Sequence, residues 1–168
     1  MTGPDQARQG SAGPDRTSND SPYTLDSAMQ AGAEDRLAEW ACEFLASPGS
    51  DNAALAAALA YEQKWWLGPV RVDLDELLRM AGPEVDDDNI VVAIDALEWE
   101  RGLGAMGDSL ARGWEPPPIL VSAHGGALRI EDGNHRHEAL RRAGHTHAWA
   151  IVWFDDEADR THYLETRQ

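Results

Sequence analysis

The apolar residues that follow position 33 are spaced as in two consecutive helices. The first helix is predicted from residues three or four positions apart, namely Leu37, Trp40, Ala41, Phe44 and Leu45. The Ser-Pro-Gly-Ser stretch at 47–50 ends it, and a second helix, capped at Asp51 or Asn52, is predicted to run to Trp66. We therefore expect an N-terminal helical hairpin over residues 34–68.

Beyond residue 68 the pattern changes to short strands and short helices. A strand over 70–74 precedes a helical turn over 75–80. Residues 89–101 favour a helix, although the Ile-Val-Val run at 90–92 would also suit a strand. Another short helix, starting at Asp108 or Ser109, must stop before the prolines at 116–118.

The last third of the chain has the clearest pattern. Strands over 119–122 and 128–131 flank a His-Gly-Gly turn, which indicates a β-hairpin. A helix over about 135–143 ends at Gly144, and a strand over 148–154 follows. This order predicts the α+β class, with a small mixed sheet and flanking helices over residues 69–156. Residues 1–33 are expected to be a disordered tail, and residues 157–168 a C-terminal tail.

Composition narrows the possible partners. The formal charge is -16, which opposes non-specific attraction to nucleic acids and anionic lipids, so we expect specific nucleic-acid binding to be disfavoured. No apolar run approaches the roughly 20 residues of a membrane span, and we expect a cytoplasmic protein with no membrane association. The single cysteine, Cys42, excludes an intrachain disulfide.

The segment 129–145 differs from this acidic background, because it holds four arginines against three acids. Within it, a polar turn connects the predicted strand to a basic helix. Gly133 permits a tight backbone turn, and the first amides of the helix, together with His135 and Arg136, form an anion-binding site in outline. Such a local basic surface suits a small anionic ligand better than a long polyanion.

The order of these segments resembles the ParB/sulfiredoxin superfamily. The resemblance covers about 69–156 and rests on Gly-Trp-Glu-Pro-Pro-Pro-Ile-Leu-Val at 113–121, a hairpin, Asp-Gly-Asn-His-Arg at 132–136, Arg-Arg-Ala-Gly at 141–144 and Ala-Ile-Val-Trp at 150–153. It implies that the Gly-x-x-Arg turn and the following helix hold nucleotide phosphates. Among the corresponding turns of the family's members, this turn is most similar to the Asp-Gly-His-His-Arg turn of the free-serine kinases.

The departures from the family restrict the activity. Asn134 stands where sulfiredoxins carry their reactive cysteine, so sulfinic acid reduction is not expected. The chain also has only 14 residues after Phe154, and we do not expect the DNA loading of ParB partition proteins. By resemblance to the kinases, Glu84 is the candidate catalytic base, with Glu76 and Asp86 as competitors.

We therefore expect a domain that binds nucleotide phosphates through Asp132, Gly133, Asn134, His135 and Arg136. Its expected cofactor is ATP or CTP with Mg²⁺, and its possible activity is that of a phosphotransferase or nucleotidase. Gly133 would allow close approach, Arg136 would pair with phosphate oxygens, His135 could donate to them, and Asp132 would hold Mg²⁺ through water or orient the arginine.

Three alternatives stay open. The turn can be purely structural, with Asn134 as a helix cap and Arg136 paired to Glu131 or Glu138. The protein can be a non-catalytic regulatory module that binds a protein partner, for example through its N-terminal hairpin, or else a DNA-associated relative or nuclease. No metal site is expected from the His-x-His pairs at 135–137 and 145–147, and most of the seven tryptophans are expected in the core.

Overall fold

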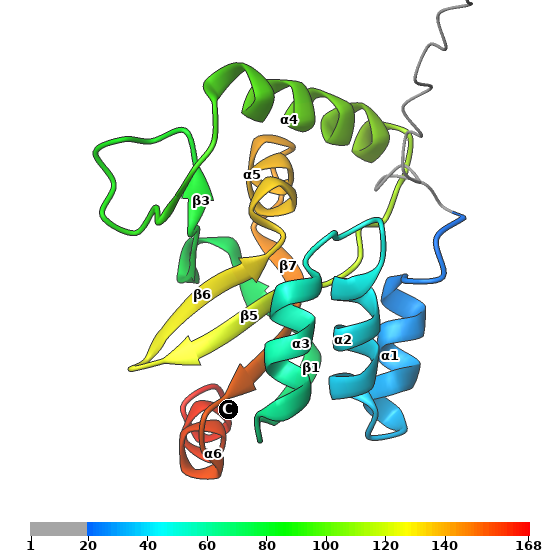
Figure 1. Cartoon of the computed structure of the whole chain (residues 1–168), viewed down its shortest axis with the longest axis vertical. Coiled ribbons are helices and arrows are strands. Elements are labelled where there is room, and N and C mark those ends of the chain that lie inside the picture. The colour runs from blue at the N-terminus through cyan, green and yellow to red at the C-terminus, as the bar shows by residue number, and fades with distance from the viewer. Residues whose placement is uncertain (1–19) are drawn as a thin grey trace, which may run out of the picture.

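The computed structural model describes residues 20–168 and consists of three layers (Figure 1). Helices α1 to α3 cover one face of a five-stranded sheet, α5 and α6 lie on the other face, and α4 packs on α5. The predicted α+β class with a small mixed sheet is confirmed. Within residues 20–168, no helix is both long and apolar enough to cross a membrane.

The described chain starts with helices, and after them short runs of strands are separated by single helices. In order they are α1 (Leu25–Ala33), α2 (Leu37–Ala46), α3 (Ala53–Tyr61), β1 (Trp65–Asp73), η1 (Leu74–Glu76), β2 (Leu77–Leu78), β3 (Ala81–Gly82), β4 (Val92–Ala93), α4 (Ala96–Ala111), β5 (Ile119–His124), β6 (Ala127–Asp132), α5 (Asn134–Arg142), β7 (His147–Phe154) and α6 (Glu157–Glu165).

The main sheet has the strand order β1-β7-β5-β6-β2. Strand β7 pairs antiparallel with β1 and parallel with β5, while β6 pairs antiparallel with β5 and parallel with β2. The predicted hairpin over β5 and β6, the helix after it and the last strand are all confirmed. A separate two-stranded sheet, β3-β4, lies beside β2 and leads into α4 (Figure 1).

Alternating residues of β7 divide the core into two clusters. Ile151 and Trp153 face the N-terminal helices, whereas Val152 and Phe154 face the layer of α5 and α6. Because successive side chains of a strand point to opposite faces, one strand can supply both cores. A third cluster joins α4 to α5 and contains Trp99, Leu103, Met106, Trp114 and Ala139.

Two segments expected to be tails are helical. Residues 25–33 form α1, which begins with a reciprocal capping box between Thr24 and Ser27 and buries Leu25, Ala28 and Ala31. Small residues make up much of this buried face, so the apolar spacing is weak in the sequence. Residues 1–19, the rest of the expected disordered tail, lie outside the described residues. At the other end, Asp156 caps α6.

The boundaries of the hairpin and of the central helix also differ from the prediction. Helix α3 ends at Tyr61 and β1 already begins at Trp65, because Trp65 and Trp66 pair with the end of β7 rather than continuing the helix. Residues 92–93 are a strand, and α4 then runs from Ala96 to Ala111 without the predicted break at Asp108. Three glycines inside α4 lower its helix propensity, and burial against α5 overrides them.

Candidate functional site

The turn between β6 and α5 has the predicted geometry. Strand β6 ends at Asp132, and α5 begins at Asn134. Between them Gly133 has φ 111°, a backbone conformation that other residues rarely adopt. The first amide groups of an α-helix point out of its N-terminal end, and in α5 this end faces the turn.

Arg136 folds back over this turn from the first helical turn of α5. Its Nη2 donates to the Asp132 carboxylate at 3.0 Å and to the Pro118 carbonyl at 3.2 Å. The residue is only 8% exposed, which is unusual for an arginine. The carboxylate of Asp132 therefore both neutralises and orients a buried guanidinium.

Residues from the N-terminal helices complete this arrangement. The hydroxyl of Ser50, in the loop between α2 and α3, donates to the second oxygen of Asp132 at 3.0 Å. The ring of Phe44 in α2 lies 5.4 Å from the Arg136 guanidinium carbon. Sequence reasoning missed Ser50 and Phe44, because nothing in the sequence places the α2–α3 loop against the turn 80 residues later.

A cavity of about 790 Å³ opens above the guanidinium. Arg136 shares its lining with apolar groups from three segments, among them Tyr23, Phe44, Trp114 and Pro117. Carboxylate side chains also line it: Asp20, Asp26, Glu43 and Glu115. The cavity therefore combines an apolar wall, one buried cation and an acidic rim.

The other two residues of the expected site point elsewhere. The side-chain oxygen of Asn134 accepts hydrogen bonds from the amides of Met80 and Ala81, at 2.8 and 3.2 Å, and so ties α5 to the chain between β2 and β3. The imidazole of His135 packs on the Trp99 ring of α4, with ring centres 4.2 Å apart. Of the five expected site residues, Arg136 lines the cavity, and Asp132 and Gly133 lie against its guanidinium. Asn134 and His135 instead connect α5 to its neighbours.

Glu84 lies outside the lining of this cavity. The Glu84 carboxylate forms an ion pair with Arg79 Nη2, and Arg79 Nη1 donates a hydrogen bond to its second oxygen at 3.2 Å. The Arg79 hydrogen bonds lower the pKa of Glu84, which makes the carboxylate a weaker base. Its expected catalytic role gains no support from this position. Glu76, one of the competitors, pairs with Arg167.

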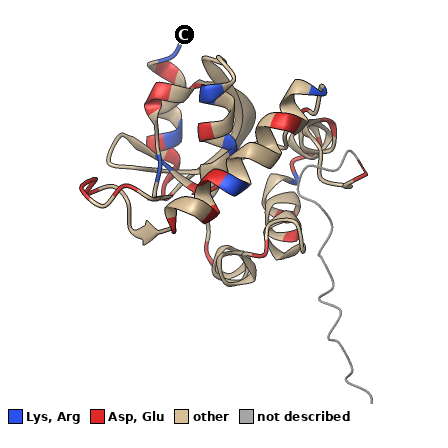
Figure 2. Ribbon diagram, turned by 90° about the horizontal axis from the view of Figure 1, so that it is seen from above, with Lys and Arg blue, Asp and Glu red and all other residues tan. Residues whose placement is uncertain are grey.

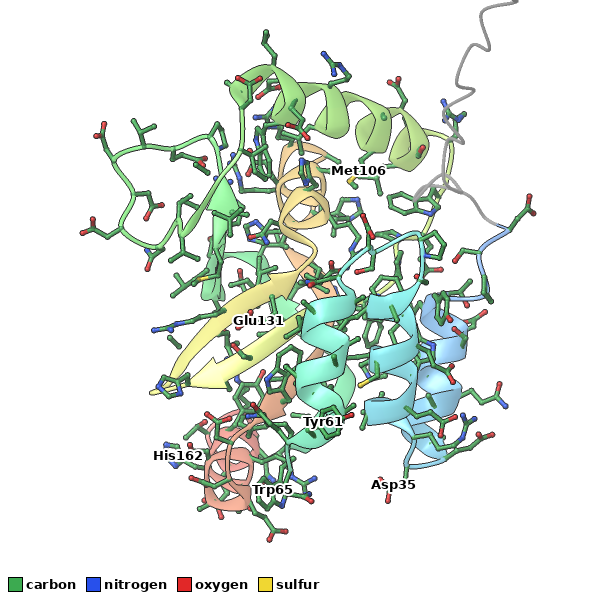
Figure 3. The ribbon with its side chains drawn as sticks, in the orientation of Figure 1. Asp35, Tyr61, Trp65, Met106, Glu131 and His162 are labelled. Carbon is green, nitrogen blue, oxygen red and sulfur yellow. The ribbon has the colours of Figure 1, made fainter. Side chains whose placement is uncertain are left out.

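The arginines at the end of α5 are engaged by acids. Glu138 accepts hydrogen bonds from Arg141 and Arg142, and Arg142 also pairs with Glu100 of α4. These bonds lower the pKa of Glu138 to about 2. In the purely structural alternative, Arg136 would pair with Glu131 or Glu138. Glu138 instead binds Arg141 and Arg142, and Glu131, labelled in Figure 3, accepts a hydrogen bond from the Ser122 hydroxyl at 2.6 Å. Much of the positive charge in 129–145 is therefore neutralised, which weakens any case for a polyanion.

His137 and Cys42 take part in packing and hydrogen bonding within the fold. His137 is buried and donates from Nε2 to the Leu74 carbonyl at 2.8 Å, and burial lowers the pKa of its imidazole. In the part of the chain that the structure describes, no group of three or more His, Cys, Asp or Glu side chains could hold a metal ion. Cys42 packs at the edge of the core, where burial raises the pKa of its thiol.

The tryptophans divide between core and partly covered positions. Trp40, Trp99, Trp114 and Trp153 are buried. Trp66 and Trp153 contact each other across the β1–β7 pair, with ring centres 5.4 Å apart. Of the seven, Trp114 is the tryptophan that lines the large cavity.

Comparison with known proteins gives little further identification. No protein-family model matches the chain, and no curated protein does. Among solved structures, the crystal structure of sulfiredoxin from Arabidopsis thaliana aligns with 56% of this chain and 94% of its own, at 20% identity and a TM-score of 0.38. That TM-score is too low to establish a shared fold.

Proposed function

We propose that this protein is a nucleotide-binding domain of the ParB/sulfiredoxin type, in which the Asp132–Arg136 turn receives the phosphates. The observation that carries the proposal is the buried guanidinium of Arg136 at the wall of a cavity large enough for a small molecule. A guanidinium matches the geometry of phosphate oxygens, and Asp132 and Ser50 hold it in place.

The apolar part of the cavity has the shape and chemistry to bind a planar ligand. Tyr23, Phe44 and Trp114 supply aromatic rings, and Pro117 adds a flat apolar contact. Aromatic rings bury large areas and accept flat partners such as nucleobases. A ligand with a base at this wall and a phosphate at Arg136 uses both features.

The acidic rim of the cavity favours a nucleotide that enters as its Mg²⁺ complex over a bare one. Four carboxylates line the cavity together with one arginine, so a bare triphosphate would meet repulsion. Bound Mg²⁺ reduces the charge of the phosphates and commonly uses one or two carboxylates together with phosphate oxygens. Asp132 is already engaged by Ser50 and Arg136, so Asp132 is proposed as a positioning residue for the arginine.

The proposal assigns no catalytic base. Transfer or hydrolysis of a phosphoryl group needs a group that positions the nucleophile, and Glu84 is paired with Arg79 away from the cavity lining. Phosphate release from ATP and CTP on long incubation separates a hydrolase from a binding protein.

Calorimetric titration with ATP, CTP and their diphosphates, with and without Mg²⁺, tests the proposal. We expect binding that requires Mg²⁺ and that weakens about tenfold or more in Arg136→Lys, which keeps the charge but loses the planar fork. Circular dichroism confirms that the variant is folded. Absence of binding to all four nucleotides at millimolar concentration would sink the proposal.

A further inference from the structure

The chain between β3 and α4 exposes an unusual number of large apolar side chains. Val85 is 90% exposed, Leu97 75%, Val91 69% and Val92 55%. These are four of the six exposed large hydrophobic residues in the described part of the chain, and they fall within 13 positions. We call residues 84–98 the acidic-loop surface. Figure 1 shows this loop and the start of α4 together at one side of the molecule.

Acidic residues are interspersed with these apolar residues along the chain. Residues 80–100 contain no lysine or arginine, and their acids are Glu84, Asp86, Asp87, Asp88, Asp95, Glu98 and Glu100. Glu84 pairs with Arg79 and Asp95 caps α4, whereas Asp86, Asp88 and Glu98 form no ion pair within residues 20–168. The red segments of the projecting loop are visible at the left of Figure 2.

We propose that the acidic-loop surface binds a basic, partly apolar polypeptide segment of a partner protein. Exposed apolar groups gathered in one place and rimmed by polar groups are characteristic of interaction sites. The charge selects the partner, because lysines or arginines that alternate with apolar residues would meet both the carboxylates and the valines. A second copy of this chain would instead bring like-charged loops together.

The backbone at this surface also suits an extended segment. Strand β4 pairs with β3 alone in the described residues, so its other edge is not covered by a strand. An extended peptide can add to such an edge through main-chain hydrogen bonds, while its side chains contact the flanking residues. The N-terminal helices offer no comparable surface, since Leu37, Trp40 and Phe44 pack inward in the core.

The acidic-loop surface is separate from the proposed nucleotide site. None of residues 84–98 lines the cavity above Arg136. Failure of nucleotide binding would therefore leave the peptide site intact, and the reverse also holds.

The test uses a fluorescent ten-residue peptide of alternating lysine and valine and measures its anisotropy with the full chain. Peptides of alternating lysine and serine and of alternating glutamate and valine are the controls for charge and apolarity. The protein variant is Val91→Ser/Leu97→Ser, which alters two exposed side chains. The matched control is Tyr61→Ser, since Tyr61 is 90% exposed at the end of α3, far from α4 (Figure 3).

We expect the lysine–valine peptide to bind at least tenfold more tightly than either control peptide. Val91→Ser/Leu97→Ser should weaken it about tenfold, Tyr61→Ser should leave it unchanged, and Asp86→Asn/Asp88→Asn should weaken it and reduce its dependence on salt. Equal binding of the lysine–serine peptide, or an equal loss in Tyr61→Ser, would overturn the proposal. So would a native dimer that Val91→Ser/Leu97→Ser converts to monomer, because a second copy would then be the partner.

Discussion

The guanidinium of Arg136 lies directly against Gly133. A Cβ atom at position 133 would be 2.8 Å from Arg136 Nη2, closer than real Cβ contacts. Gly133 is therefore required twice, once by its φ of 111° and once by the arginine that folds over it. The Gly-x-x-Arg spacing follows from this packing, because an arginine three residues into the helix can reach back over the turn.

Gly133→Ala should destabilise the protein more than Gly144→Ala. Both glycines have positive φ, but a Cβ at Gly144 would meet no atom within 4 Å. We expect a loss of about 1 kcal/mol in the free energy of unfolding for Gly144→Ala from backbone strain alone. Gly133→Ala should lose at least about 2 kcal/mol, because the arginine must also move. Urea unfolding measures both, and equal losses would mean that Arg136 adapts without cost.

Asn134→Ala should loosen the connection between α5 and the β3-β4 region. The substitution leaves the amides of Met80 and Ala81 without their shared acceptor, and we expect a loss of about 1–3 kcal/mol. Asn134→Asp keeps an oxygen acceptor at the start of the helix and should retain most of the stability. The two variants are compared by urea unfolding and by hydrogen exchange of the two amides. If the amides of Met80 and Ala81 exchange equally slowly in Asn134→Ala and Asn134→Asp, the Asn134 side chain does not hold them.

Glu138 should make the stability depend on acid. Its pKa falls from an ordinary 4.5 to about 2 on folding, so its ion pairs stabilise the folded state fully above pH 4.5 and are lost as the pH falls from 4.5 towards 2. The loss over that range amounts to at most about 3 kcal/mol. Urea unfolding between pH 6 and pH 3 should show a shallower dependence in Glu138→Gln. Glu98→Gln, an exposed control in α4, should behave like the native protein.

Glu43→Gln should strengthen nucleotide binding at the cavity. Glu43 is an exposed residue of the acidic rim, and its removal reduces repulsion of phosphates by an amount corresponding to about a twofold gain in affinity. Glu39→Gln, on the same helix but outside the lining, is the matched control. The comparison is made by calorimetry with the same nucleotide and Mg²⁺ concentrations. A weaker affinity in Glu43→Gln would indicate that the carboxylate takes part in binding Mg²⁺.

Local sequence rules predicted the site best where the chemistry is local. The strand, glycine turn and basic helix at 128–143 form as expected, because alternation, a positive φ and helical spacing involve near neighbours. The partners of the same residues depend on distant segments. Asn134 meets Met80 and Ala81, His135 meets Trp99, and Ser50 reaches Asp132.

The sequence by itself determined the α+β class, the hairpin and the glycine turn that leads into a basic helix. Only the tertiary structure decided that Arg136 is buried beside Asp132, that an acid-rimmed cavity opens above Arg136 and that Glu84 forms an ion pair with Arg79. The physical reason is the range of the interactions. Periodicity records which face of an element is buried, whereas ion pairs and cavities depend on which elements meet.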